Sequence, residues 1–380
     1  MRKIFFLFLL ISGIYVVMPK DLTIARDKTA LRSGPANYYD IILYLKAGTK
    51  VTDLGVAKED EGWIKVKYQN REGFISKIAL SEVKKASDPF ASLEGKDFGK
   101  TKNEISPASY TAAIKGFALD YSRKKGYGNY DVESLFNSIT FKYTDVIKVL
   151  NETKLAYFPK KGELIGVEST FINERIQGVG WAIAMDVIQQ YGIVFDLEMT
   201  KRLNIIANVL IRQTVDYDSQ YVVLIISDSE PVAFSGPGGF IFISDTLLKM
   251  LTDYRELVAV LAHEIGHIAL RHGFRDVAID EARAAMKSSF DELESETFSE
   301  KELALSEELE SIIDMAVEAC KLVRDSKEEY EADDVAIELL RRYKIDKKFL
   351  KETLAKVYMK LGNKYPEYKT QFELRIKKIK

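Results

Sequence analysis

The chain has 380 residues, of which 47% are hydrophobic and 29% are charged, and its formal net charge is −2. This length and composition are typical of a soluble globular protein with two or three domains and an ample core. A net charge close to zero leaves no basic footprint for nucleic acid. The single cysteine, Cys320, excludes both an internal disulfide framework and a zinc site built from cysteines.

Residues 1–20 have the pattern of a secretory signal. Arg2 and Lys3 precede an apolar run over residues 4–18, which is the order of the charged and hydrophobic regions in such signals. The run is shorter than the roughly 20 residues that cross a bilayer comfortably. We therefore expect an exported protein of the periplasm or cell envelope. Membrane association would arise only if this segment stays uncleaved as an anchor.

Short β-prone runs alternate with turns over residues 22–83. They occupy residues 30–35, 41–45, 48–52, 62–67 and 73–76. Strands of this length and spacing predict a small barrel. The order Arg-Ser-Gly-Pro, Gly-Thr-x-Val, Gly-Trp and Gly-Phe resembles the bacterial SH3-like domain, which implies binding of a peptide or of peptidoglycan. A spacer or a regulatory module within the chain is an equally open reading, because fold does not fix function.

Residues 84–108 are rich in Lys, Ser, Gly and Asp and lack periodicity, so we interpret them as a linker. We expect one further domain over residues 109–380. Amphipathic patterns predict helices over residues 177–191 and 198–215, and a β-prone run predicts a strand over residues 221–227.

A glycine turn introduces the next predicted strand. Gly238 and Gly239 allow a tight turn, and the apolar run that follows consists of Phe240, Ile241, Phe242 and Ile243. We expect this run to have a free edge, to which an extended substrate could add from Gly239 onward by strand pairing. The alternative is an ordinary hairpin within a core sheet.

The chain's three histidines lie close together at residues 263, 267 and 272. His263 and His267 are four residues apart, so on an α-helix they share one face and can bind one metal ion. Glu264 is then placed to activate a water molecule beside the metal. A capping pair, Asp253 and Glu256, and an apolar stripe support a buried helix here. The alternative is a pair of ordinary core histidines.

A catalytic zinc ion needs a third protein ligand. The extended pattern of some zinc peptidases requires Gly at 270 and His at 273, but Leu270 and Gly273 stand there. His272 points away from the metal face of a continuing helix, and we interpret it as a helix-end residue or a support for a ligand.

A carboxylate on another helix is the remaining source of the third ligand. Glu329 and Asp333 are four residues apart, so the first could bind the metal while the second orients a ligand histidine. Ser326 and Glu329 also fit a simple capping box. Spacing alone leaves both interpretations open.

Two motifs carry a family resemblance. His263-Glu264-x-x-His267 followed by Glu329-x-x-Ala-Asp333 is similar to the gluzincin endopeptidases of metallopeptidase family forty-eight, and residues 233–244 resemble that family's Pro-Gly-Gly segment. The resemblance implies that Glu329 is the third ligand of one Zn²⁺ per chain and that the substrates are proteins or peptides. It also implies quality control in the cell envelope.

The expected fold is therefore α+β: a small all-β SH3-like barrel precedes a mainly helical gluzincin metallopeptidase domain with a small active-site β-sheet. The sequence departs from the family pattern at three points, with Val232 in place of Asn, Ser326 in place of Arg, and Tyr365-Pro366 in place of His-Pro. The last leaves the group that stabilises the oxyanion unassigned, with Arg375 and Tyr330 as candidates.

Two segments near the site have further expectations. Residues 291–310 are strongly acidic, which is typical of a solvated helix face and would also suit a mobile cover over the cleft. Residues 331–362 are predicted to continue as helix. Two other functions stay open: a scaffold with a structural or latent zinc site, and a cell-wall-binding protein that acts through its SH3-like domain.

Overall fold

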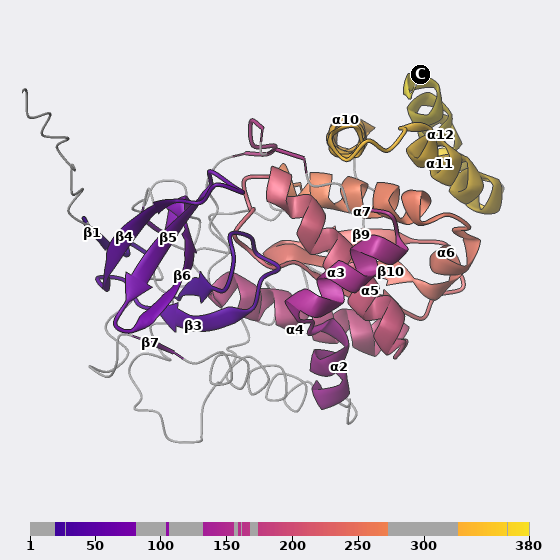
Figure 1. The fold of residues 1–380 in the computed structure, drawn as a ribbon. Coiled ribbons are helices and arrows are strands. Elements are labelled where there is room, and N and C mark those ends of the chain that lie inside the picture. Colours follow the sequence, from indigo (N-terminus) through magenta and orange to yellow (C-terminus); the bar gives the residue numbers. More distant parts are fainter. Residues whose placement is uncertain are drawn as a thin grey trace, which may run out of the picture.

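The computed structural model of the chain has two parts, a β-rich N-terminal part and a helical part built around a second, smaller sheet (Figure 1). This arrangement confirms the α+β class. The structure describes residues 20–80 except 27, 104–105, 132–155 and 159–167 except 161, and then 174–272 and 326–379 except 363. The predicted signal up to residue 19, most of the linker and the acidic segment 291–310 lie outside the described residues.

The N-terminal part is a seven-stranded antiparallel sheet with the order β1-β4-β5-β6-β2-β3-β7. Its strands are β1 (Asp21–Thr23), β2 (Thr29–Arg32), β3 (Ile41–Leu45), β4 (Lys50–Val56), β5 (Trp63–Tyr68), β6 (Arg71–Ser76) and β7 (Glu104–Ile105). Leu31, Leu45, Val66 and Ile75 are fully buried in its core. The five predicted strands are confirmed. The expected linker also contributes β7, which pairs with β3.

The helical part carries α2 (Val132–Ile139), α3 (Tyr143–Glu152), α4 (Glu174–Tyr191), α5 (Leu197–Leu210), α6 (Asp245–Met250), α7 (Tyr254–Ala269), α10 (Ser326–Arg342), α11 (Lys348–Leu361) and α12 (Pro366–Lys378). Helix α7 packs most extensively against α10 and also contacts α5, α11 and β9. Within the described ranges, no helix is both long enough and apolar enough to cross a membrane.

The predicted continuous helix over residues 331–362 is wrong. Helix α10 ends at Arg342 and α11 begins at Lys348. Between them Lys344 adopts a left-handed conformation with φ of 58°, and the buried Tyr343 donates a hydrogen bond from its hydroxyl to the carbonyl of Val209. The turn thus serves packing against α5, and without a Gly or Pro it leaves no mark on the sequence.

The small sheet has the order β8-β10-β9, with β8 (Val222–Ile226), β9 (Ala233–Gly236) and β10 (Phe240–Ser244). Strand β10 pairs with β8 in parallel and with β9 in antiparallel orientation along its whole apolar run. The expected free edge at residues 240–243 therefore does not exist, because both sides of the strand are occupied. Of the strands that the structure describes, β9 is the neighbour of β10 on the side away from β8.

Two asparagines of α5 close the opposite edge of the sheet. The Asn204 side chain donates to the Val223 carbonyl and accepts from the Val223 amide, at 2.8 and 2.9 Å. Asn208 bonds in the same way to the backbone of Tyr221. These side chains replace a neighbouring strand and satisfy the backbone groups of β8. These contacts exclude an added strand at Tyr221 and Val223 on the β8 side.

The barrel is docked on the helical part through buried polar contacts. Arg212 of the helical part and Asp60 of the barrel form an ion pair of 2.8 Å, with side chains 6% and 1% exposed. Asn37, in the loop between β2 and β3, donates to the Asn208 side chain and to the Ser219 carbonyl. Its neighbour Tyr38 belongs to the hydrophobic core of the helical part. The N-terminal sheet is therefore integrated into the fold of the larger part.

Candidate metal centre

Helix α7 begins at a fixed cap. Asp253 accepts a hydrogen bond from the Arg255 amide at 2.9 Å, and the Glu256 carboxylate accepts from the amides of Thr252 and Asp253. Lys356 of α11 pairs with the buried Glu256 carboxylate at 2.5 Å. The predicted capping box is thus confirmed, and it fixes the register of α7 from which His263 and His267 project.

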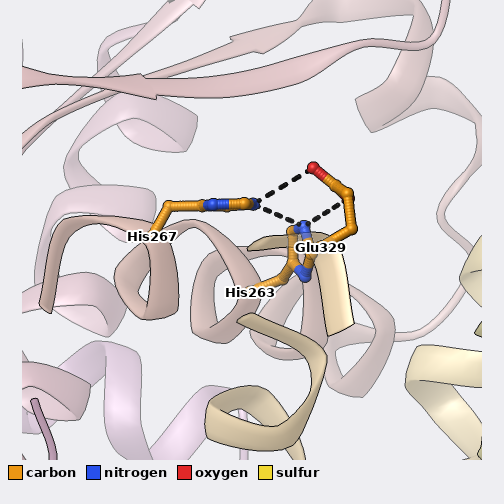
Figure 2. Close-up of side chains that lie close together, drawn as sticks. All are labelled: His263, His267 and Glu329. Atoms are coloured by element: carbon orange, nitrogen blue, oxygen red, sulfur yellow. Dashed lines mark hydrogen bonds and ion pairs between the residues drawn. The ribbon is translucent and has the colours of Figure 1, made fainter. Parts of the chain in front are cut away.

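His263, His267 and Glu329 come together between α7 and α10 (Figure 2). The two Nε2 atoms are 3.1 Å apart. Oxygens of the Glu329 carboxylate lie 3.4 Å from each Nε2. Zinc bonds of about 2.0–2.1 Å in tetrahedral geometry place neighbouring ligand atoms about 3.3–3.4 Å apart. The spacing of the three groups therefore fits a single zinc ion.

The second nitrogen of His263 faces Asp333. The Nδ1 atom lies 3.0 Å from the Asp333 carboxylate, which is 1% exposed. Arg375 of α12 donates two hydrogen bonds of 2.8 Å to the same carboxylate, and its third nitrogen lies 2.5 Å from Glu329. Asp333 can thus orient His263 for the metal, and Arg375 compensates the negative charge of two buried carboxylates.

These contacts determine the protonation states of the two carboxylates. Burial raises the pKa of Asp333, but hydrogen bonds from Arg375 and His263 outweigh it and lower the pKa to about 2. Burial likewise opposes ionisation of Glu329, yet the charge of Arg375 and the hydrogen bonds of both histidines hold its pKa well below the usual range. Both carboxylates are therefore ionised at neutral pH.

His263 shows the opposite shift. Burial and the charge of Arg375 lower its pKa, but the hydrogen bonds with Asp333 and Glu329 prevail and raise it to about 9. Without a metal ion this imidazole therefore carries a proton at neutral pH. Zinc requires the neutral ring, so metal uptake would release that proton, and the apparent affinity would fall as the pH drops below about 9.

A glycine allows α10 to approach close enough for Glu329 to reach the histidines. A Cβ atom at Gly266 would lie 2.9 Å from the Ala332 carbonyl oxygen and 3.2 Å from Cβ of Val335. Ala332 is itself fully buried. Small residues on both helices therefore set the distance between α7 and α10. They belong to the two sequence motifs, although only the ligand residues were predicted to matter.

A cleft of about 440 Å³ opens onto these residues. Glu264 lines it together with His263, His267, Glu329 and Arg375. Its remaining walls include apolar side chains of α6, α7 and α11, residues at the start of β9, and tyrosines at the start of α12. Among them are Leu247, Val260, Leu350, Leu354, Val232, Ala233, Phe234, Tyr365 and Tyr368. The predicted base and the three predicted ligands thus share one partly apolar cavity.

The predicted substrate strand is not at this cavity. Gly239 to Ile243 do not line the cleft, whereas Val232, Ala233 and Phe234 do. Gly239 has a φ of 85°, and a side chain there would lie 2.8 Å from the Tyr221 ring. The absence of a side chain at Gly239 thus permits both the turn and the packing of the small sheet.

Of the two oxyanion candidates, Arg375 lines the cleft and Tyr330 is not among its lining residues. The Tyr330 ring faces the Lys378 ammonium group at 5.1 Å. Tyr365 and Tyr368 line the cleft and were missed. Tyr365 bonds to Glu230 across the cleft mouth at 2.7 Å, and its only signal in the sequence is its place in the Tyr-Pro pair.

One helix presents His-Glu-x-x-His, and a second helix adds a carboxylate. This arrangement of residues is typical of metallopeptidases. Residues 198–370 match the model of Peptidase family M48, and residues 27–81 match the model of the Bacterial SH3 domain. The chain thus carries a metalloendopeptidase domain of family M48 behind an N-terminal bacterial SH3 domain. No curated protein matches the chain.

Proposed function

We propose that the chain is an exported zinc endopeptidase that cleaves proteins of the cell envelope, with a role in their quality control. The observation that carries the proposal is the shared cleft, in which Glu264 accompanies His263, His267 and Glu329. When bound, zinc would act as a Lewis acid toward water and the peptide carbonyl. The two histidines and Glu329 would hold the ion through Nε2 and carboxylate oxygens.

Glu264 supplies the proton transfers. Its carboxylate takes a proton from the attacking water and passes it to the nitrogen of the leaving amine, so one group serves as base and then as acid. Asp333 keeps the His263 ring oriented through Nδ1. Apolar side chains line part of the cleft and lower its local polarity, which strengthens the electrostatic interactions within the site.

The substrate binds along β9. An extended peptide would lie along Ala233 and Phe234 at the start of β9, which line the cleft and are partly exposed. The run Phe240–Ser244 supports β9 from behind and has no free backbone groups to offer. The proposed substrate strand is therefore β9, in place of the expected run from Gly239 to Ile243.

The test is cleavage of an unfolded protein such as casein by the zinc-loaded chain without residues 1–20. Glu264→Gln with the same zinc content is the matched control, because it keeps the shape of the side chain and removes the base. We expect cleavage by the first and a rate lower by about 10²–10⁴-fold for the second. Equal rates, or zinc-loaded chain that cleaves no unfolded protein, would contradict the proposal.

The SH3-like domain provides the proposed link to the envelope. Its family match suggests cell-wall binding, and we assign peptidoglycan or a peptide as its ligand. Deleting this domain is a poor test, because Tyr38 and Asp60 also pack against the peptidase part. Co-sedimentation of the full chain with purified peptidoglycan is the better one, and a chain that stays in the supernatant would contradict the assignment of peptidoglycan.

Export rests on the pattern of residues 1–20. N-terminal sequencing of protein recovered from the cell envelope would distinguish a cleaved signal from a retained anchor. Recovery from the cytoplasm alone would contradict export.

A further inference from the structure

His272 lies directly behind the metal ligand His267. Its side chain is buried, and its Nδ1 atom is 2.9 Å from Nδ1 of His267. On its other side, Nε2 of His272 lies 3.0 Å from the Glu331 carboxylate of α10. The three side chains thus form a line that starts at a partly exposed carboxylate and ends at the metal site.

The required tautomers are consistent along this line. His267 faces His263 and Glu329 through Nε2, so metal binding leaves its proton on Nδ1. That Nδ1–H group then donates to Nδ1 of His272, which carries its own proton on Nε2 and donates it to Glu331. Ligand histidines usually give their second N–H to a carboxylate or carbonyl. Here a second histidine stands between the ligand and the carboxylate.

The chain turns sharply to bring His272 into this place. At the end of α7 the His272 amide bonds to the His267 carbonyl at 3.0 Å, and the Arg271 amide bonds to the Ile268 carbonyl at 3.1 Å. Arg271 has a φ of 63°, a left-handed conformation that glycine usually supplies at this position. A residue with a Cβ atom is sterically disfavoured in this conformation.

Asp216 holds the turn in place. It accepts hydrogen bonds of 2.7 and 2.8 Å from the two terminal nitrogens of Arg271, and its second oxygen also accepts from the Tyr221 hydroxyl. A bidentate, buried carboxylate–guanidinium pair of this kind is strong and directional. It offsets the backbone cost at Arg271 and thereby fixes the residue that follows, His272.

We propose that His272 is a positioning residue for zinc binding: it accepts a hydrogen bond from the Nδ1–H group of His267, donates one from its own Nε2–H group to Glu331, and so fixes the tautomer and orientation of the ligand. The claim rests on the proposed metal site. It concerns His267 alone, since His263 has its own direct partner in Asp333. Each histidine ligand is thus supported by a different carboxylate of α10.

The test measures zinc affinity of the full chain by competition with a chromophoric chelator. His272→Phe removes both nitrogens at similar shape, and we expect an affinity lower by about 10- to 100-fold. His272→Asn keeps an acceptor near the Nδ1 position, and Glu331→Ala removes only the carboxylate at the far end of the line. The zinc affinities of both variants should therefore lie between those of His272→Phe and the wild type. Lys327→Ala, an exposed change beside Glu331 on α10, is the matched control and should match the wild type.

The visible spectrum of the cobalt-substituted protein supplies a second measurement. Loss of the hydrogen bond changes the donor strength of His267, so the ligand-field bands of His272→Phe should shift while those of Lys327→Ala do not. If His272→Phe does not fold, His272→Asn and Glu331→Ala decide the question against Lys327→Ala.

Zinc affinities and spectra equal to those of the wild type in the His272 and Glu331 variants would overturn the proposal. A zinc affinity of His272→Asn as low as that of His272→Phe would also overturn it. The readout is independent of proteolysis. A graded series in affinity with no cleavage of casein would contradict the proposed function and support the line of contacts.

Discussion

The metal centre and the surface between the barrel and the peptidase part both depend on buried charges, but they differ in how those charges are placed. At the metal centre, residues of α7 lie four positions apart and meet two residues of α10 that are also four apart. At the domain contact, Asp60 and Arg212 are 152 positions apart in the sequence. Helical periodicity thus defines one region, whereas tertiary docking alone defines the other.

The largest effect should appear at the domain contact. Arg212→Met leaves the Asp60 carboxylate, 1% exposed, without its ion-pair partner. Removing one member of a buried pair costs about 3–5 kcal/mol. We expect a loss of this size in urea unfolding followed by circular dichroism.

Arg202→Met is the control for that experiment. Arg202 pairs with Glu152 at a similar distance of 2.9 Å, but both side chains are more than a third exposed, so its loss should cost less than about 1 kcal/mol. Equal unfolding midpoints for Arg202→Met and Arg212→Met would mean that the barrel is not held by this pair.

A smaller effect is expected at the crossing of α7 and α10. Gly266→Ala gains up to about 1 kcal/mol in helix propensity, but the new Cβ would approach the Ala332 backbone to 2.9 Å. Overpacking of this kind typically costs about 1–3 kcal/mol. We predict net destabilisation together with weaker zinc binding, because the helices must separate and carry Glu329 away from His263 and His267. A stabilised variant with unchanged zinc affinity would show that the close approach is unimportant.

The smallest effect concerns the start of α7. Asp253→Ala removes the side-chain cap that accepts from the Arg255 amide, and such changes cost about 1 kcal/mol. Asp334→Ala on α10 is the comparison, since that carboxylate is 63% exposed and pairs with Lys378 on the surface. Similar thermal midpoints for the two variants would argue against a role of the cap in fixing the metal helix.

Much of the metal centre could be predicted because its signals are local. The spacing of His263 and His267 fixes a shared helix face, and the apolar stripe around them requires burial. Glu329 was different: its spacing from Ser326 also fitted a simple capping box, and family resemblance favoured it as a ligand. Its carboxylate reaches the histidines only because Gly266 and Ala332 bring the helices together.

The errors have a common physical origin in tertiary context. An apolar β-prone run such as Phe240–Ser244 reads the same at the centre of a sheet and at its edge. The distinction is made by β8 and β9, which pair with the two sides of this run. Likewise, the turn at Lys344 is fixed by burial of Tyr343 against α5. Neither partner could be paired from sequence spacing.

The contacts between the N-terminal sheet and the helical part could not be predicted from the sequence. His272 was expected at the helix end or as a support for a ligand, but its partners His267 and Glu331 could not be predicted. Asp60, Arg212 and Asp216 are ordinary charged residues until the fold buries them. His272 could be excluded as a ligand by helical geometry, but its ring contacts His267 because the chain turns at Arg271. In this protein, the two histidine ligands follow from sequence periodicity, whereas the contact of His272 with His267 follows from the end of α7 and from packing.

The most direct test of the metal centre is X-ray anomalous scattering at the zinc edge from crystals of the purified chain. We predict one peak per chain, between Nε2 of His263, Nε2 of His267 and the carboxylate of Glu329, with bond lengths of about 2.0–2.2 Å. A peak at any other group of residues, or none in protein that contains one equivalent of zinc, would contradict the assignment of these three side chains as the metal ligands.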